Sequence, residues 1–205
     1  MSKYGNEKIF MKKIAIFWFR RDLRLEDNVG FTAALKSGYT VLPIFIFDKQ
    51  ILDKLPKEDP RVDFIFETLQ NMRQELRESF ASSIAMYYDT PESVFKALLS
   101  EYDIAEVFTN RDYEPYAQER DEQIKNLLEK EKISFNTYKD QVIFEKQEIV
   151  KNDGLPYVVY TPYKNKWKEH FDVNKHLEKH SALENLGILV DDKRLPNVTL
   201  SDMGF

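Results

Sequence analysis

The feature that most restricts the fold is a regular alternation of short apolar runs with stretches of helical periodicity. β-Branched and aromatic residues dominate the apolar runs, which span 12–19, 41–47, 84–88, 106–109 and a last region formed by 133–138 with 142–144. Short continuous runs of this kind are typical of strands buried on both faces. Between them, apolar residues recur at helical spacing, which predicts helices over 28–36, 61–78, 91–99 and 115–130.

The alternation predicts parallel strands with helices on both faces of the sheet, because each parallel connection must cross over one face. We therefore expect an α/β fold, a Rossmann-like three-layer sandwich with a five-stranded parallel sheet. The 205 residues suffice for one large domain with a tail. Since 42% of them are hydrophobic and 14% aromatic, such a domain can bury a substantial core.

The remaining composition excludes several kinds of site. The chain has no Cys, which rules out disulfides, thiolate nucleophiles, iron–sulfur clusters and cysteine zinc sites. Its six Gly are too dispersed for a G-x-G-x-x-G or Walker A phosphate loop. We expect the three His, at 170, 176 and 180, to be surface residues, and we predict no metal site.

Charge and hydropathy bear on the possible partners. The net charge of -5, from 30 basic and 35 acidic residues, argues mildly against nucleic-acid binding by this chain alone, because domains that grip phosphates are usually basic. The longest apolar stretches, 14–19 and 41–47, are too short to span a bilayer. We therefore predict a soluble, cytoplasmic protein without membrane partners.

Charged and aromatic residues directly follow three of the expected strands, at 19–24, 48–49 and 110–114. In an open α/β sheet, ligands bind beyond the carboxyl ends of the strands, where the strand order reverses. In the absence of a glycine loop, these segments favour a flat aromatic or anionic organic ligand over a pyrophosphate. Alternatively, the charges form salt bridges that fix the first loop to neighbouring helices, an interpretation that concerns Arg20, Asp22, Arg24 and Asp27.

The helix expected from Pro115 to Lys130 carries a charge on its apolar face. Its stripe of Ala117, Ile124, Leu127 and Leu128 places Arg120 or Asp121 facing inward. A buried charge is costly unless it is paired. Either this charge pairs with the arginine-rich loop at 20–24, or the end of the helix projects past the sheet into solvent.

The regular alternation of expected strands and helices ends at about residue 145. A turn signal at 152–154 indicates a hairpin or a loop, and Thr161-Pro162 opens a short helix through Trp167. Tyr and Lys residues alternate here in a way that suits either base stacking or packing of the rings on a neighbouring domain. We predict an α/β domain over 1–170, followed over 171–205 by a linker or a wrapping segment.

Three sequence blocks resemble the photolyase/cryptochrome family. The first is Trp18 to Asn28, which reads W-F-R-R-D-L-R-L-E-D-N and fills every fixed position of the family motif. The second is N-R-D-Y-E-P-Y-A at 110–117 with Arg120-Asp121, and the third is 154–167 with its core Y-T-P-Y-K. Their order and spacing agree with the N-terminal α/β domain of that family from residue 12 to at least Trp167.

The resemblance implies a light-harvesting domain of a DNA photolyase. In that family the α/β domain houses an antenna chromophore, which is a folate, a deazaflavin or a flavin, and a helical C-terminal domain binds FAD and damaged DNA. Excited, reduced FAD donates an electron to a pyrimidine dimer flipped out of the duplex. On this resemblance the chain ends within the interdomain linker and lacks the FAD domain, so we do not expect it to repair DNA alone.

The resemblance also implies candidate chromophore-binding residues: Arg21, Phe45, Asp48 and Asp112, which match positions used by deazaflavin-binding relatives. Folate-binding relatives carry a glutamate where this chain has Ala117, which favours deazaflavin or flavin over folate. Some relatives hold no antenna, so an empty pocket stays open as an alternative. A cryptochrome-like signalling or interaction module and a free-standing nucleotide-binding module are the other functions that these residues allow.

Overall fold

The computed structural model describes residues 13–182, 188–191 and 195–205, so residues 1–12 and part of the expected linker lie outside the described residues. Five strands form one parallel sheet in the order β3-β2-β1-β4-β5. The strands are β1 (Ile14–Phe19), β2 (Thr40–Asp48), β3 (Ala85–Asp89), β4 (Ile104–Asn110) and β5 (Ser134–Tyr138). This confirms the predicted α/β sandwich.

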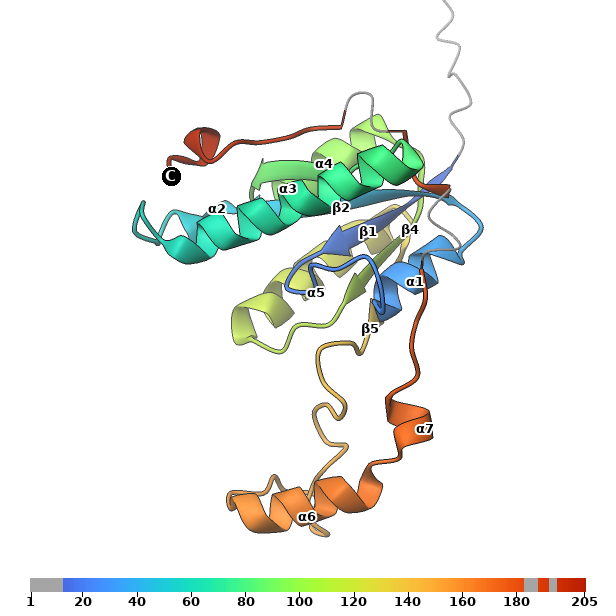
Figure 1. Cartoon of the computed structure of the whole chain (residues 1–205), viewed down its shortest axis with the longest axis vertical. Coiled ribbons are helices and arrows are strands. Elements are labelled where there is room, and N and C mark those ends of the chain that lie inside the picture. The colour runs from blue at the N-terminus through green and yellow to red at the C-terminus, as the bar shows by residue number, and fades with distance from the viewer. Residues whose placement is uncertain (1–12, 183–187, 192–194) are drawn as a thin grey trace, which may run out of the picture.

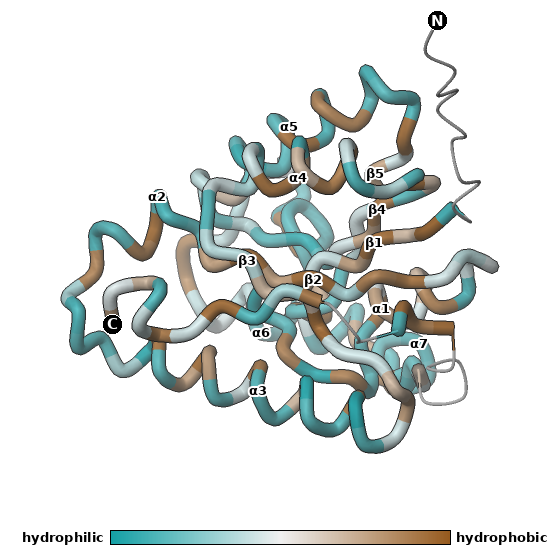
Figure 2. Tube along the Cα trace, turned by 90° about the horizontal axis from the view of Figure 1, so that it is seen from above, coloured by the Kyte–Doolittle hydropathy of each residue, from teal (hydrophilic) through white to brown (hydrophobic). Residues whose placement is uncertain are grey.

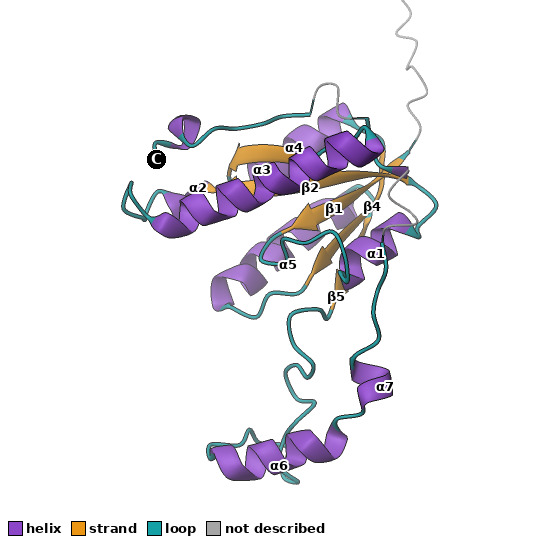
Figure 3. Ribbon diagram, in the orientation of Figure 1, coloured by secondary structure: helices purple, strands orange, loops and turns teal. Residues whose placement is uncertain are grey.

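Helices cover both faces of the sheet, and together they make three layers (Figure 1; Figure 3). One face carries α1 (Val29–Leu35) and α3 (Pro60–Phe80), and the other carries α4 (Pro91–Glu101) and α5 (Pro115–Lys130). The short α2 (Lys49–Leu52) follows β2 directly. The α1 cap is the one expected from sequence, because the side chain of Asn28 accepts a hydrogen bond from the Phe31 amide at 3.0 Å.

The core forms two apolar layers, one on each side of the sheet. Figure 2 shows the apolar residues that follow one another along the strands. All six residues of β1 are buried, and their side chains alternate between the layers. Phe17 lies in the layer under α1, with its ring centroid 4.6 Å from that of Phe19 and 5.1 Å from that of Phe31. Trp18 lies in the opposite layer, 5.2 Å from Phe95 of α4.

Residues 140–180 leave the sandwich and project away from it, and we call them the protruding segment (Figure 1). It carries α6 (Tyr160–His170), which contains the predicted helix, and α7 (Val173–His176). The chain turns at Gly154, where φ is +78°, and makes a loop rather than a hairpin. None of the residues of α6 is buried.

Two predictions in this region are wrong. Val142–Phe144 is not a strand, because the chain leaves the sheet after β5 and the ring of Phe144 packs instead on Trp167 at 5.4 Å. His176 is not a free surface residue, because its half-buried ring lies 4.8 Å from Phe144 and 5.8 Å from Phe171. A small aromatic cluster therefore holds α6 and α7 together.

The last described residues return to the sandwich. Leu189 forms a parallel bridge with Val41, and the amide of Met86 in β3 donates to the carbonyl of Pro196 at 2.8 Å. Met203 is 5% exposed and belongs to the core layer beside α3. The end of the tail therefore wraps the edge strand and α3, as one of the two sequence interpretations expected.

Candidate functional site

The carboxyl ends of β1, β2 and β4 meet at one edge of the sheet, beside the point where the strand order reverses. A cavity of about 190 Å³ lies there, between these strand ends, α2, α3 and the start of α5. Its lining includes all four residues predicted from the family motifs, namely Arg21, Phe45, Asp48 and Asp112. The three polar segments that follow separate strands in the sequence therefore do converge.

Paired charges form one side of the cavity. The Nε atom of Arg21 lies 3.2 Å from Oδ2 of Asp112, and its Nη2 atom lies 2.7 Å from Oε1 of Glu114. The hydrogen bond to Glu114 is the largest cause that raises the pKa of Arg21, and the charge of Asp112 adds to it. The Asp112 side chain is 9% exposed, so its carboxylate is held in place beside the cavity by a guanidinium.

A second carboxylate closes the cavity on the side of β2. Asp48 is 4% exposed, and its Oδ1 atom accepts from the Gln50 amide at 3.0 Å, which caps α2. Its Oδ2 atom accepts a hydrogen bond from the hydroxyl of Tyr116, the second residue of α5. Burial, followed by this hydrogen bond, raises the pKa of Tyr116, so the hydroxyl keeps its proton at neutral pH.

Apolar side chains form the wall between these polar groups. Phe45 is 7% exposed, and its ring lies 4.8 Å from that of Phe47 at an interplanar angle of 68°. Ile51 and Leu52 of α2 and Ile65 of α3 complete the wall. Apolar walls with a few fixed polar groups are typical of small-molecule sites.

Two arginines stack on the indole of Trp18 at the base of the cavity. The guanidinium carbon of Arg120 lies 4.9 Å from the indole centroid and that of Arg20 lies 5.2 Å from it. Both arginines share Asp121, with Nη–Oδ1 distances of 2.6 Å for Arg20 and 3.2 Å for Arg120. Burial and the neighbouring Arg20 charge lower the pKa of Arg120. The inward charge of α5 is Arg120, which pairs with Asp121 of its own helix, and Asp121 in turn pairs with Arg20 of the arginine-rich loop. The helix is therefore joined to that loop through Asp121, as one of the two alternatives predicted.

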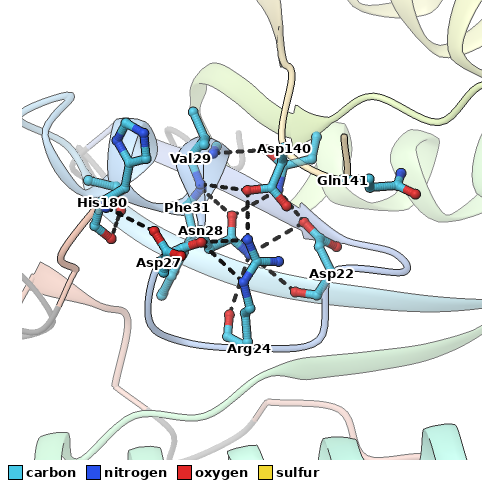
Figure 4. A network of polar contacts seen from close by, with 12 residues as sticks. Asp22, Arg24, Asp27, Asn28, Val29, Phe31, Asp140, Gln141 and His180 are labelled. Carbon is cyan, nitrogen blue, oxygen red and sulfur yellow. Dashed lines mark hydrogen bonds and ion pairs between the residues drawn. The ribbon is translucent and has the colours of Figure 1, made fainter. Parts of the chain in front are cut away.

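Most of the charged loop after β1 has a structural role. Asp140 lies at the N-terminal end of α1, where its Oδ1 atom accepts from Nη2 of Arg24 at 2.8 Å and from the Val29 amide at 3.0 Å (Figure 4). Asp27 in turn accepts from the amide of His180 at 3.0 Å (Figure 4). The salt-bridge interpretation holds for Arg20, which pairs with Asp121 of α5, whereas Arg24 pairs with a loop residue and Arg21 faces the cavity. Asp22 and Asp27 accept hydrogen bonds from Asn110 and from the His180 amide.

Asn110 at the end of β4 joins this loop to the sheet. Its Nδ2 atom donates to Asp22 and, at 2.8 Å, to Oδ1 of Asn28, while its own Oδ1 accepts from the Gly30 amide at 2.9 Å. A Cβ at residue 30 would lie 2.5 Å from that oxygen, so this position of α1 requires glycine. The network fixes the backbone from which Arg20 and Arg21 reach the cavity.

Sequence reasoning missed Tyr116 and, apart from Phe45, the apolar wall. Tyr116 belongs to the second family block, and its place in the first turn of α5 at the sheet edge was the available signal. No local pattern marks Ile51 and Ile65, because they come from a four-residue helix and from the edge of a long amphipathic one. Among the described residues, no cluster of His, Asp and Glu is arranged to hold a metal ion.

The family model for DNA photolyase matches residues 15–183, most of the described chain. The chain belongs to the DNA photolyase family. It is 31% identical over 153 residues to a deoxyribodipyrimidine photo-lyase of Synechococcus sp., an alignment that covers 75% of this chain and 31% of the relative. The chain thus spans about a third of that relative's length and corresponds to the N-terminal α/β domain of the family.

Solved structures agree with this assignment. A bacterial class III photolyase from Agrobacterium tumefaciens matches 97% of this chain and 39% of its own, with a TM-score of 0.78 and 23% identity, which supports the fold. An archaeal photolyase from Sulfolobus tokodaii, described with two FAD molecules and a novel light-harvesting cofactor, matches 82% of this chain and 36% of its own. Its TM-score is 0.66 and its identity 28%.

No helix in the described ranges is long and apolar enough to cross a bilayer.

Proposed function

We propose that the cavity at the carboxyl ends of β1, β2 and β4 binds the antenna chromophore of a light-driven DNA repair enzyme. The observation that carries the proposal is the convergence of Arg21, Phe45, Asp48 and Asp112 on one cavity with apolar walls. Two carboxylates, a guanidinium and a phenyl ring match the polar edges and flat faces of a planar conjugated ring system, and a flavin or a deazaflavin is favoured over a folate. Such a chromophore, when bound, supplies light absorption and transfers its excitation to a second cofactor.

The residues of this chain orient that ring system and keep water from it. Asp112, held by Arg21, presents a carboxylate that can accept a hydrogen bond from a ring N–H or O–H. Phe45 and its aliphatic neighbours Ile51 and Leu52 provide the apolar surface against which the ring lies. Because Trp18 and Arg120 are nearly fully buried, the base of the cavity is rigid and excludes solvent.

We further propose that repair of pyrimidine dimers requires a helical C-terminal domain that binds FAD and the damaged DNA, with residues from about 171 onward as the linker. Exposed apolar residues of the protruding segment support such a partner: Val158 is 91% exposed and Val173 is 60% exposed. A cytoplasmic location accords with this role.

Titration of the protein with riboflavin, 8-hydroxy-5-deazariboflavin and a methenylated folate, followed by fluorescence, tests the chromophore proposal. We expect one of the two tricyclic compounds to bind and the folate not to bind. Asp112→Asn weakens binding about tenfold, because the neutral amide is a poorer acceptor. Asp153→Asn is the matched control, since that carboxylate lies in the protruding segment and is exposed. Equal affinity of the wild type and Asp112→Asn would contradict the assignment.

A further inference from the structure

The cavity is smaller than the ligand that it is proposed to hold. Its volume is about 190 Å³, whereas small-molecule sites in proteins begin at roughly 300 Å³. An apolar cavity of about 150 Å³ holds a single aromatic ring such as benzene, and a tricyclic ring system is larger than that. Binding of a flavin or a deazaflavin therefore requires that one of the lining side chains moves.

Tyr116 is the lining side chain whose position is held by one directed contact across the cavity. It begins on α5, and its hydroxyl reaches the carboxylate of Asp48 at the end of β2, so the hydrogen bond links the two sides. On its other face the ring lies against Arg120, whose guanidinium carbon is 5.9 Å from the ring centroid. Rotation of the tyrosine side chain therefore costs one hydrogen bond and one cation–π contact, without any change in the sheet.

The other buried groups of the cavity are less able to move, and the exposed guanidinium of Arg21 is held by Asp112 and Glu114. Trp18 is 2% exposed and is held between Phe95 and two arginines. Phe45 lies within β2, and Asp48 is fixed by the Gln50 amide as the cap of α2. Widening the cavity through these residues would disturb the sheet or a helix cap.

We propose that Tyr116 is the gate of the chromophore cavity. In the free protein its hydroxyl donates to Asp48 and acts as a latch that keeps the cavity closed. When the chromophore binds, a ring N–H or O–H of the chromophore replaces that hydroxyl as the donor to Asp48. The exchange keeps Asp48 satisfied, which matters because a buried carboxylate that loses its donor is strongly destabilising. The gate thus selects ring systems that carry a donor at the edge facing Asp48. This inference rests on the proposed function.

Stopped-flow binding of riboflavin and of 8-hydroxy-5-deazariboflavin to Tyr116→Phe tests the gate. Loss of the hydroxyl removes the latch from the free protein and leaves the complex unchanged, so we expect association to be about tenfold faster and dissociation to be unaltered. Tyr113→Phe is the matched control. Tyr113 lies between β4 and α5, outside the cavity, and its hydroxyl donates to Glu145 at 2.7 Å. Tyr116→Leu, which removes both the hydroxyl and the ring, should also associate faster.

Thermal unfolding and circular dichroism establish that each variant is folded before its binding rates are compared. If the wild type binds a probe and Tyr116→Phe binds it at the same rate or more slowly, Tyr116 is not a gate. If dissociation from Tyr116→Phe is accelerated, the hydroxyl contacts the chromophore in the complex and the exchange is wrong. If neither probe binds the wild type, the chromophore proposal itself fails and the gate fails with it.

Discussion

The sandwich and the protruding segment differ in how their apolar side chains are covered. All six residues of β1 are buried, whereas α6 has no buried residue and the neighbouring Val158 and Val159 are 91% and 59% exposed. Both regions are rich in aromatic and aliphatic residues, so composition does not separate them. The difference indicates that the sandwich completes its own core, and the exposed apolar residues of the protruding segment agree with the docking of another domain proposed above.

The two regions also differ in how their charges are paired. In the sandwich, Asp121 binds two arginines and is itself 18% exposed, so its contacts are sheltered from water. In the protruding segment, Lys166 and Glu169 form an exposed pair at 3.2 Å, one helical turn apart. Exposed pairs of this kind contribute at most about 1 kcal/mol. The sandwich charges therefore fix structure, and those of α6 mainly keep its surface solvated.

The largest contrast is expected from truncating a phenylalanine in each region. Phe17→Ala removes a fully buried ring between Phe19 and Phe31 and should lower the free energy of unfolding by about 3–5 kcal/mol. Phe171→Ala removes a half-buried ring next to Trp167 and should cost about 1 kcal/mol or less. Urea unfolding followed by circular dichroism measures both. Similar costs would mean that the protruding segment folds as part of the same core.

A second contrast concerns the buried ion pairs. Asp121→Asn removes the charge shared by Arg20 and Arg120, and we expect a loss of about 3 kcal/mol because two sheltered guanidinium groups lose their carboxylate. Glu122→Gln, the next residue on the same helix, changes an exposed carboxylate and should cost less than about 0.5 kcal/mol. If both variants unfolded at the same urea concentration, the ion pairs of Asp121 with Arg20 and Arg120 would contribute nothing to stability.

Alkaline pH should lower the stability of the sandwich, because its tyrosines are held protonated in the folded state. Burial raises the pKa of Tyr116 and of Tyr113, and hydrogen bonds to Asp48 and Glu145 add to the effect. A pKa raised in the folded state gives stability that is complete below the unfolded value, about 10, and is lost as the pH rises above it. The free energy of unfolding should therefore fall between about pH 10 and pH 11.

Urea unfolding of Tyr116→Phe at about pH 9 and about pH 11 checks the origin of this loss. The variant should lose less stability over that interval than the wild type does. Tyr160→Phe, whose side chain is 72% exposed in α6, should behave like the wild type. A decline of the same size in all three proteins would assign the alkaline loss to other groups.

The smallest effect on stability is expected at the exposed valines of the protruding segment. Val158→Ser should change the free energy of unfolding by less than about 0.5 kcal/mol, because the side chain is 91% exposed. The same change should weaken association with the helical FAD domain of a relative, measured by calorimetry. Lys164→Gln, a nearby change on α6 that leaves the apolar surface intact, serves as the control. Unchanged association of Val158→Ser would argue against docking through this surface.

Much of the fold could be predicted because its signals are local. The buried runs of β1 and β2, the Asn28 cap and the bounds of α5 all follow from side-chain patterning within a few residues. The prediction of a strand at Val142–Phe144 was wrong because a three-residue apolar run has no periodicity of its own. Its partner, Trp167, lies far along the chain and could not be inferred from spacing.

By itself the sequence determined the family, the parallel sandwich and the convergence of Arg21, Asp48 and Asp112 at one edge of the sheet, since parallel strands bring their carboxyl ends together. Only the tertiary structure decided which of these groups pair and how large the space between them is. Tyr116 reaches Asp48 across the cavity, and Asp121 serves two arginines, because packing brings α5 against the ends of β1 and β2. Such contacts depend on side-chain distances between remote segments, which no local pattern encodes.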